Sequence, residues 1–225
     1  MKNETRNKLL LALGFILVIA AMYLVWIFVP TEDKMGIVQR IFYLMVPFAW
    51  LSIMSFFVIF IASILYLAKR DSKWDIMAHS AGELGFIATS ITLMVGILWM
   101  RPIWGTWWTW EPRLTATLVL WFIYLSYLMV RSFATEESRG ARFAAVVGII
   151  GFVDVPIVGM ATTLWRVIHP PLIIFTGGVD PKMLFTVLTS VVAYTVLFIV
   201  LLNLKISIRK QQTELKRLKG LYTWI

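Results

Sequence analysis

The chain has 225 residues, 60% of them hydrophobic, and carries a net charge of +9 with no cysteine. Soluble domains contain roughly 45–50% apolar residues, so this composition excludes an ordinary soluble fold. The absence of cysteine excludes disulfides, thiolate metal sites, iron–sulfur clusters and attachment of a cofactor through a Cys-x-x-Cys-His motif.

Six apolar segments follow one another along the chain. They are Leu9–Val29, Ile41–Ala68, Ile76–Met100, Leu114–Val130, Phe143–Trp165 and Met183–Leu204. A helix that crosses a bilayer needs about 20 residues, so each segment is long enough to span. The first segment is too long for a signal peptide and has no small-residue cleavage pattern, so we expect it to be retained. The sequence predicts an all-α integral membrane protein with six transmembrane helices in one domain, residues 1–225.

The basic residues distinguish the two ends of these helices. Of the 21 lysines and arginines, 15 lie in one set of connections, residues 1–8, 69–75, 131–142 and 205–225. The other six lie in residues 30–40, 101–113 and 166–182. By the positive-inside rule, both termini are predicted to be cytoplasmic and segment 101–113 to lie on the outer face. Topology and attraction to anionic lipid explain the net charge, and nucleic-acid binding is not expected because the charges are scattered over short loops.

Four of the 11 tryptophans lie between Trp104 and Trp110. Trp104, Trp107, Trp108 and Glu111 recur with helical spacing, which predicts a short interfacial helix, and Pro112 is suited to begin the next transmembrane helix. Tryptophan favours places where apolar and wet surroundings meet, and its ring offers a flat surface to a planar ligand. The cluster is therefore either a membrane-interface belt or a ligand platform.

His169 is the only histidine in the outer connections, because His79 belongs to the opposite end of the helices. Imidazole coordinates haem iron, aromatic rings sandwich a porphyrin, and guanidinium groups pair with propionates. His169, the tryptophans and the outer arginines therefore match the requirements of a haem site. Met45, near the outer end of the second helix, is by default a packing or lipid-facing residue, but its thioether is also a candidate second axial ligand.

Residues 104–115 resemble the tryptophan-rich WWD signature of haem-handling proteins in cytochrome c maturation. With six helices and a short chain, the sequence resembles the haem exporter protein C (CcmC) family. The resemblance implies haem b held non-covalently on the periplasmic or outer face of a bacterial or archaeal cytoplasmic membrane. It also implies delivery of that haem to the chaperone CcmE, together with the ABC transporter subunits CcmA and CcmB and the small subunit CcmD.

The resemblance implies haem flanked by one histidine from the first outer loop and one from the third. His169 matches the third-loop histidine, whereas Met45 stands where the family has the first, and Glu111 replaces the usual aspartate. Three ligand sets remain open: His/Met, His with an open position, or His with a ligand from a partner.

The leading hypothesis is a haem-delivery protein that is not an enzyme. Trp104, Trp107, Trp108 and Trp110 form the platform and His169 ligates iron, while Arg40 and Arg113 bind propionates or pair with Glu111. One alternative is a cytochrome c synthase of the CcsA type, for which extra helices or a large outer partner would be expected. Another is a transporter with a tryptophan-lined vestibule.

Two acidic residues lie inside apolar segments, where a charged group costs about 2.5–3.5 kcal/mol at the centre of a helix on insertion scales. Glu83 is near the start of its segment and is expected to have a structural or headgroup role. Asp154 lies nearer mid-helix and is expected to be protonated, paired or lining a cavity. Neither is expected to be catalytic.

Overall fold

The structure is a computed structural model that describes residues 2–33, 35–133, 137–165 and 180–222. Its helices are α1 (Lys2–Tyr23), α2 (Phe42–Lys69), α3 (Ser72–Trp104), α4 (Pro112–Phe133), α5 (Glu137–Gly151), α6 (Asp154–Leu164) and α7 (Pro181–Tyr222). A π-helical turn, η1 (Leu24–Phe28), extends α1, and a 3₁₀ turn, η2 (Ile37–Ile41), leads into α2. Within the described ranges no strand is present, and six helical spans are long and apolar enough to cross a membrane. The predictions of an all-α fold and of six helices long and apolar enough to span a membrane are confirmed for these ranges.

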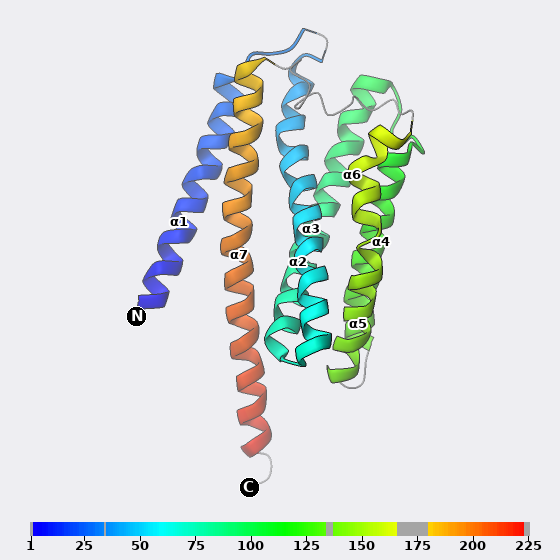
Figure 1. Cartoon of the computed structure of the whole chain (residues 1–225). Helices are drawn as coiled ribbons and strands as arrows, with labels where there is room; N and C mark the ends of the chain where they lie inside the picture. The colour runs from blue at the N-terminus through cyan, green and yellow to red at the C-terminus, as the bar shows by residue number, and fades with distance from the viewer. Residues whose placement is uncertain (1, 34, 134–136, 166–179, 223–225) are drawn as a thin grey trace.

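The helices run up and down in a single bundle, with α1 and α7 side by side on one flank (Figure 1). The first helix begins and α7 ends at the same end of the bundle, here called the terminal end. The opposite end carries the connection between α3 and α4, residues 105–111, and is called the Trp end. Helix α7 continues without interruption to Tyr222, well past its apolar part.

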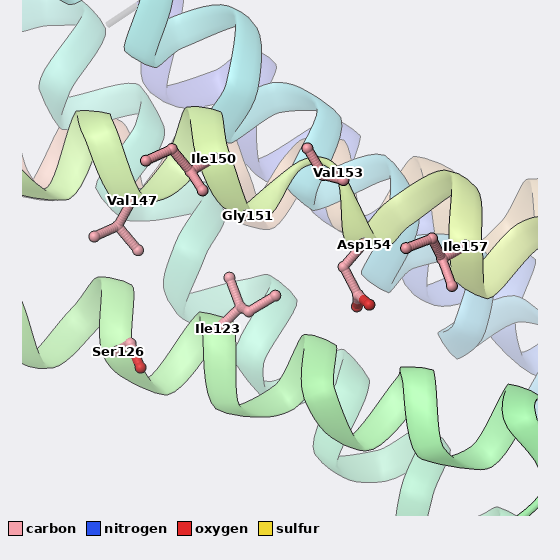
Figure 2. A pocket seen from close by; sticks show the side chains of 8 residues that line it. All are labelled: Ile123, Ser126, Val147, Ile150, Gly151, Val153, Asp154 and Ile157. Atoms are coloured by element: carbon pink, nitrogen blue, oxygen red, sulfur yellow. The ribbon is translucent and has the colours of Figure 1, made fainter.

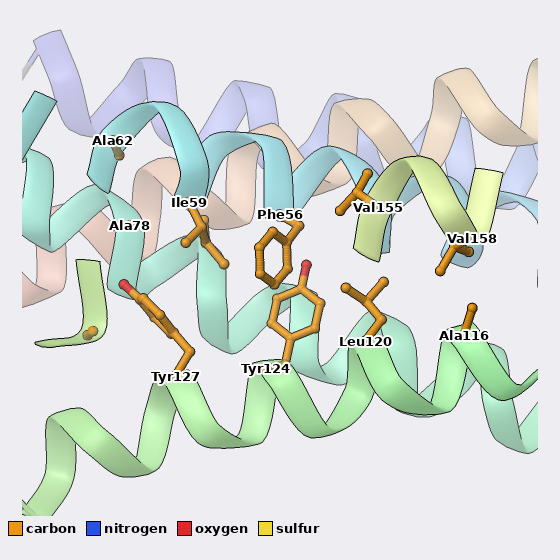
Figure 3. Close-up of a cluster of buried hydrophobic side chains, with 12 residues drawn as sticks. Phe56, Ile59, Ala62, Ala78, Ala116, Leu120, Tyr124, Tyr127, Val155 and Val158 are labelled. Carbon is orange, nitrogen blue, oxygen red and sulfur yellow. The ribbon is translucent and has the colours of Figure 1, made fainter. Parts of the chain in front are cut away.

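The main core lies between α2, α3, α4 and the α5–α6 pair (Figure 3). Rings of Phe56 and Tyr124 meet edge to face with centroids 5.0 Å apart, and the Tyr124 hydroxyl donates to the Ser52 carbonyl at 2.6 Å. Close approach of these helices requires small residues. Gly85 of α3 lies directly under the Tyr124 ring, so the tyrosine fills the space that a side chain at Gly85 would occupy.

The fifth span is not continuous, because α5 and α6 are separated by Phe152 and Val153. The N–H groups of these residues donate to the carbonyls three residues earlier, at 3.3 Å and 3.2 Å, in place of the α-helical pattern. Pro156 follows in the first turn of α6, where its missing N–H is tolerated. The sequence predicted one segment, Phe143–Trp165, without this break.

Glu83 ties α3 to α7 near the terminal end. Its carboxylate accepts from the Lys205 ammonium at 2.5 Å and from the Arg209 guanidinium at 2.6 Å, and Arg209 also lies 3.2 Å from the His79 ring nitrogen. A second ion pair joins Arg131 of α4 to Asp75 of α3. Glu83 thus has a structural role as expected, and its partners lie on a helix that is far away in the sequence but adjacent in space.

Replacing Glu83 with Gln is expected to lower the free energy of unfolding by about 1–3 kcal/mol. Hydrogen bonds to charged groups are worth about 1.5–3 kcal/mol each, and partial exposure of this carboxylate, 31% on the side chain, reduces that value. Thermal unfolding of the purified protein in detergent measures the change. The control is Lys73→Gln, which removes an exposed ion pair with Asp71 that contributes little to stability. Equal unfolding temperatures for the two variants would contradict the prediction.

Candidate functional site

The connection between α3 and α4 contains no regular secondary structure and is held by local hydrogen bonds. Gly105 adopts φ +73° and ends α3, its N–H donating to the Arg101 carbonyl at 3.0 Å. The Arg101 guanidinium donates back to the Gly105 carbonyl at 2.5 Å, and the Thr106 hydroxyl donates to the Trp108 carbonyl at 3.1 Å. The predicted short interfacial helix over residues 104–111 is therefore wrong, whereas the predicted start of the next helix at Pro112 is confirmed.

Residues 104–111, here called the tryptophan segment, comprise the last residue of α3 and the connection, and their four tryptophans divide into an inner and an outer pair. Trp104 and Trp108 are half-buried and pack on a cluster that includes the buried Trp99. Trp107 and Trp110 are exposed, at 55% and 76%. The rings of Trp104 and Trp99 meet edge to face at 5.2 Å, and those of Trp108 and Trp110 at 5.6 Å. The inner pair thus anchors the segment and the outer pair is presented to the surroundings.

Two further polar groups lie in or beside the tryptophan segment. The Arg101 guanidinium covers the Trp107 ring at 5.6 Å from its centroid, a cation–π contact that restrains the exposed ring. The Trp108 indole N–H is buried, and no hydrogen-bond acceptor contacts it within the part of the chain that the structure describes. A buried donor without an acceptor is costly, so this N–H is suited to an incoming acceptor group.

Glu111 and Arg113 flank the first residue of α4. Glu111 is buried, at 7% exposed, and interacts electrostatically with the half-buried guanidinium of Arg113. The Glu111 carbonyl also accepts from the Thr115 N–H at 3.0 Å and from the Thr115 hydroxyl at 2.9 Å. The two charged residues therefore attract each other at the base of the tryptophan segment.

Arg40 is engaged with the end of the first span. Its guanidinium donates to the Trp26 carbonyl at 3.0 Å and to the Thr31 hydroxyl at 3.3 Å, and it lies 5.5 Å from the Trp26 ring centroid. The sequence patterns did not pair Trp26 with Arg40. The two are 14 residues apart, so no local spacing pattern indicates the contact.

A buried amide beside Arg40 was also missed. Gln39, 3% exposed, donates to the Tyr43 hydroxyl at 2.7 Å and accepts from the Glu32 N–H at 2.9 Å. This residue fixes the connection before α2 against that helix. The only available signal was the spacing of Gln39 and Tyr43, which places both on one helical face.

Met45 lies deeper in the bundle than the tryptophan segment. Its sulfur packs against Gly96 of α3, 3.8 Å from the position that a β-carbon would occupy there. Gly96 precedes Trp104 by two helical turns, about 12 Å along the axis. The predicted iron ligand His169 lies outside the described residues, so the structure does not relate it to either position.

The chain is similar to a known protein family over nearly its whole length. A family model described as "CcmC: Heme exporter protein C" matches residues 3–219. The chain belongs to the haem exporter protein C family. The family is one of transporter components, and membership connects the chain to haem handling in cytochrome c maturation and to a multi-pass membrane location.

Individual relatives agree with this family. Heme exporter protein C of Bradyrhizobium diazoefficiens is 34% identical over 175 residues, which cover 76% of this chain and 66% of that protein. Heme exporter protein C of Escherichia coli K12 is 30% identical over 156 residues, 69% of this chain and 64% of the relative. A putative cytochrome c biosynthesis ccmC-like mitochondrial protein of Arabidopsis thaliana is 30% identical over 194 residues, which cover 84% of this chain and 73% of that protein. The match thus spans just under two thirds of the length of these two bacterial relatives.

Proposed function

We propose that this chain binds haem b non-covalently at its Trp end and passes it to a haem chaperone without catalysing a reaction. The observation that carries the proposal is the pair of exposed rings, Trp107 and Trp110, on a segment anchored by two packed ones. Large exposed indoles that are held in place offer a preorganised apolar surface to a planar ligand, which lowers the entropic cost of binding.

In this proposal the iron is ligated by His169 through its imidazole. Met45 is the second axial ligand only if its side chain leaves Gly96 and turns towards the Trp end. The alternatives are an open position or a ligand from a partner. In each arrangement the indole rings of Trp107 and Trp110 would contact the porphyrin beside the ligated iron, because neither ring is buried by the bundle.

The charged residues have different parts in the proposed site. Arg113 is half-buried beside Glu111, and a propionate would compete with that carboxylate for the guanidinium. Arg40 already binds the Trp26 carbonyl and Thr31, so it would bind a propionate with its remaining N–H groups or keep the structural role. Of the two arginines, Arg113 lies next in sequence to the tryptophan segment and is the stronger candidate.

The proposed orientation places the Trp end on the periplasmic or outer face and the terminal end in the cytoplasm. The support is the excess of basic residues in the connections and tails of the terminal end. The proposed partners are the chaperone CcmE, which takes the haem, and the subunits CcmA, CcmB and CcmD. Membership in the haem exporter protein C family supports this assignment. The alternative, a cytochrome c synthase of the CcsA type, has no such support.

Replacing Trp107 and Trp110 together with Ala is expected to weaken haem binding roughly tenfold to a hundredfold. Aromatic contacts are worth about 0.5–1.5 kcal/mol per ring beyond the area that they bury, and each 1.4 kcal/mol is a factor of ten. Haem titration of the purified protein, followed by its Soret absorption, measures the change. The control is Trp50→Ala, because the ring of Trp50 is also exposed, at 46%, but lies on α2 and donates to Thr195. Equal haem affinity in both variants would remove the outer pair from the site.

A further inference from the structure

A pocket lies between α4 and the broken fifth span, away from the tryptophan segment (Figure 2). It has a volume of about 360 Å³ and is lined by Ile123, Ser126, Val147, Ile150, Gly151, Val153, Asp154 and Ile157. The break between α5 and α6 places Asp154 at the first position of α6, inside the apolar span Ser138–Ala161. The pocket is therefore at membrane depth.

The Asp154 carboxylate points from α6 into the space towards α4. The residue is only 8% exposed, and its Oδ2 atom has no hydrogen-bond partner within the described ranges. Ser126, the other polar side chain of the pocket, donates its hydroxyl to the Phe122 carbonyl of its own helix at 2.8 Å. The carboxylate thus faces an otherwise apolar pocket, and its Oδ2 atom has no donor among the described residues.

Such a carboxyl group requires compensation. Acidic residues inside transmembrane segments are costly, and they normally face a bundle interior and pair with another group. The N-terminal end of the α6 dipole favours a negative charge at this position, but that effect is modest and supplies no hydrogen bond here. No cationic donor among the described residues supplies this compensation.

The surroundings of the pocket indicate which kind of molecule supplies a donor to the Asp154 carboxylate. Ile150 and Val153, at its rim, are 67% and 65% exposed, which forms an apolar surface suited to a helix within the bilayer. A lipid acyl chain would cover the surface but carries no donor. A second copy of this chain, docked symmetrically through the same face, would bring two Asp154 carboxylates together.

We propose that this groove is the docking site for a transmembrane helix of a partner protein, whose Lys or Arg side chain pairs with the Asp154 carboxylate. The interface is separate from the haem site and does not depend on it. Docking fills the pocket with the basic side chain, covers Ile150 and Val153, and gives the buried carboxylate its missing donors.

The test uses the absence of cysteine from the chain. A single cysteine replaces Ile157, which lines the pocket, and is labelled with a thiol-reactive photocrosslinker in membranes of the native host. The control replaces Phe122, which lies on α4 and is 53% exposed outside the pocket. Mass spectrometry of the crosslinked peptide is expected to identify a partner segment of about 20 apolar residues, with Lys or Arg within one helical turn of the crosslink, only for Ile157→Cys.

A second change separates docking from a structural role. Asp154→Asn keeps the shape of the carboxyl group and is expected to reduce the crosslink at least about tenfold, because one partner of a buried ion pair has been neutralised. Exchanging the charges, Asp154→Lys with the partner's base changed to Asp, is expected to restore the crosslink. The purified chain alone should be at least as stable to heat with Asn as with Asp, since it loses an uncompensated charge.

Three outcomes would overturn the proposal. One is crosslinking only to lipid or to a second copy of this chain. Another is an undiminished crosslink in Asp154→Asn. The third is a lower unfolding temperature of the isolated Asp154→Asn chain with an unchanged crosslink, which would assign Asp154 to stabilisation of the α6 N-terminus.

Discussion

Replacing His169 with Ala is expected to abolish the absorption spectrum of histidine-ligated haem. Without this imidazole the iron has a different set of ligands, although the tryptophan segment can still contact the porphyrin. Both the position and the intensity of the Soret band therefore change. The measurement compares spectra and haem content of the wild-type and variant proteins purified from the same cells. A spectrum and haem content identical to wild type would remove His169 from the site.

The matched variant for this experiment is Met45→His. Since Met45 stands where the family resemblance implies a histidine, this change should move the spectrum towards bis-histidine ligation if the side chain reaches the iron. An unchanged spectrum would mean that the residue at position 45 stays against Gly96, where the structure places it. The second ligand would then be absent or supplied by a partner.

Replacing Gly85 with Ala is expected to destabilise the protein by about 2–6 kcal/mol. A β-carbon at Gly85 would lie 2.5 Å from two ring atoms of Tyr124, and this tyrosine is fully buried. Overpacking costs about 1–3 kcal/mol, and displacement of the ring also breaks the hydrogen bond from Tyr124 to Ser52, which adds about 1–3 kcal/mol. Thermal unfolding and the yield of monodisperse protein in detergent measure the loss.

The control for this substitution is Gly96→Ala on the same helix. A β-carbon at Gly96 meets only the Met45 sulfur at 3.8 Å, an ordinary van der Waals distance. The variant is therefore expected to keep wild-type stability or to gain slightly from the higher helix propensity of alanine. Equal stability of the two variants would show that the contact between Gly85 and Tyr124 does not limit packing of α3 on α4.

The tryptophan segment illustrates how far local patterns reach. Helical spacing predicted a helix over residues 104–111, but Gly105 adopts a positive φ and the Thr106 hydroxyl bonds the Trp108 carbonyl. Spacing describes which residues would share a face if the backbone were helical, and it does not weigh competing turn interactions. Gly105 itself was the available signal for a helix end.

The candidate site was predictable in residue type but not in arrangement. The tryptophans identified the segment, yet their spacing could not tell the exposed Trp107 and Trp110 from the packed Trp104 and Trp108, because packing depends on Trp99 and on α4. Arg40 was a candidate for propionate binding from its position alone. Its contacts with Trp26 and Thr31 follow from the meeting of two spans, which the sequence does not encode as a motif.

The amino-acid sequence by itself determined the membrane class, the six spans and the tryptophan segment. These follow from apolar length, because backbone groups in a bilayer must be satisfied within each helix, and this constraint acts along a single stretch of chain. Only the tertiary structure decided that Glu83 binds Lys205 and Arg209, residues 122 and 126 positions away, and that Asp154 faces a pocket against α4. Such contacts depend on how separate helices pack, and their energies arise only after the helices have come together.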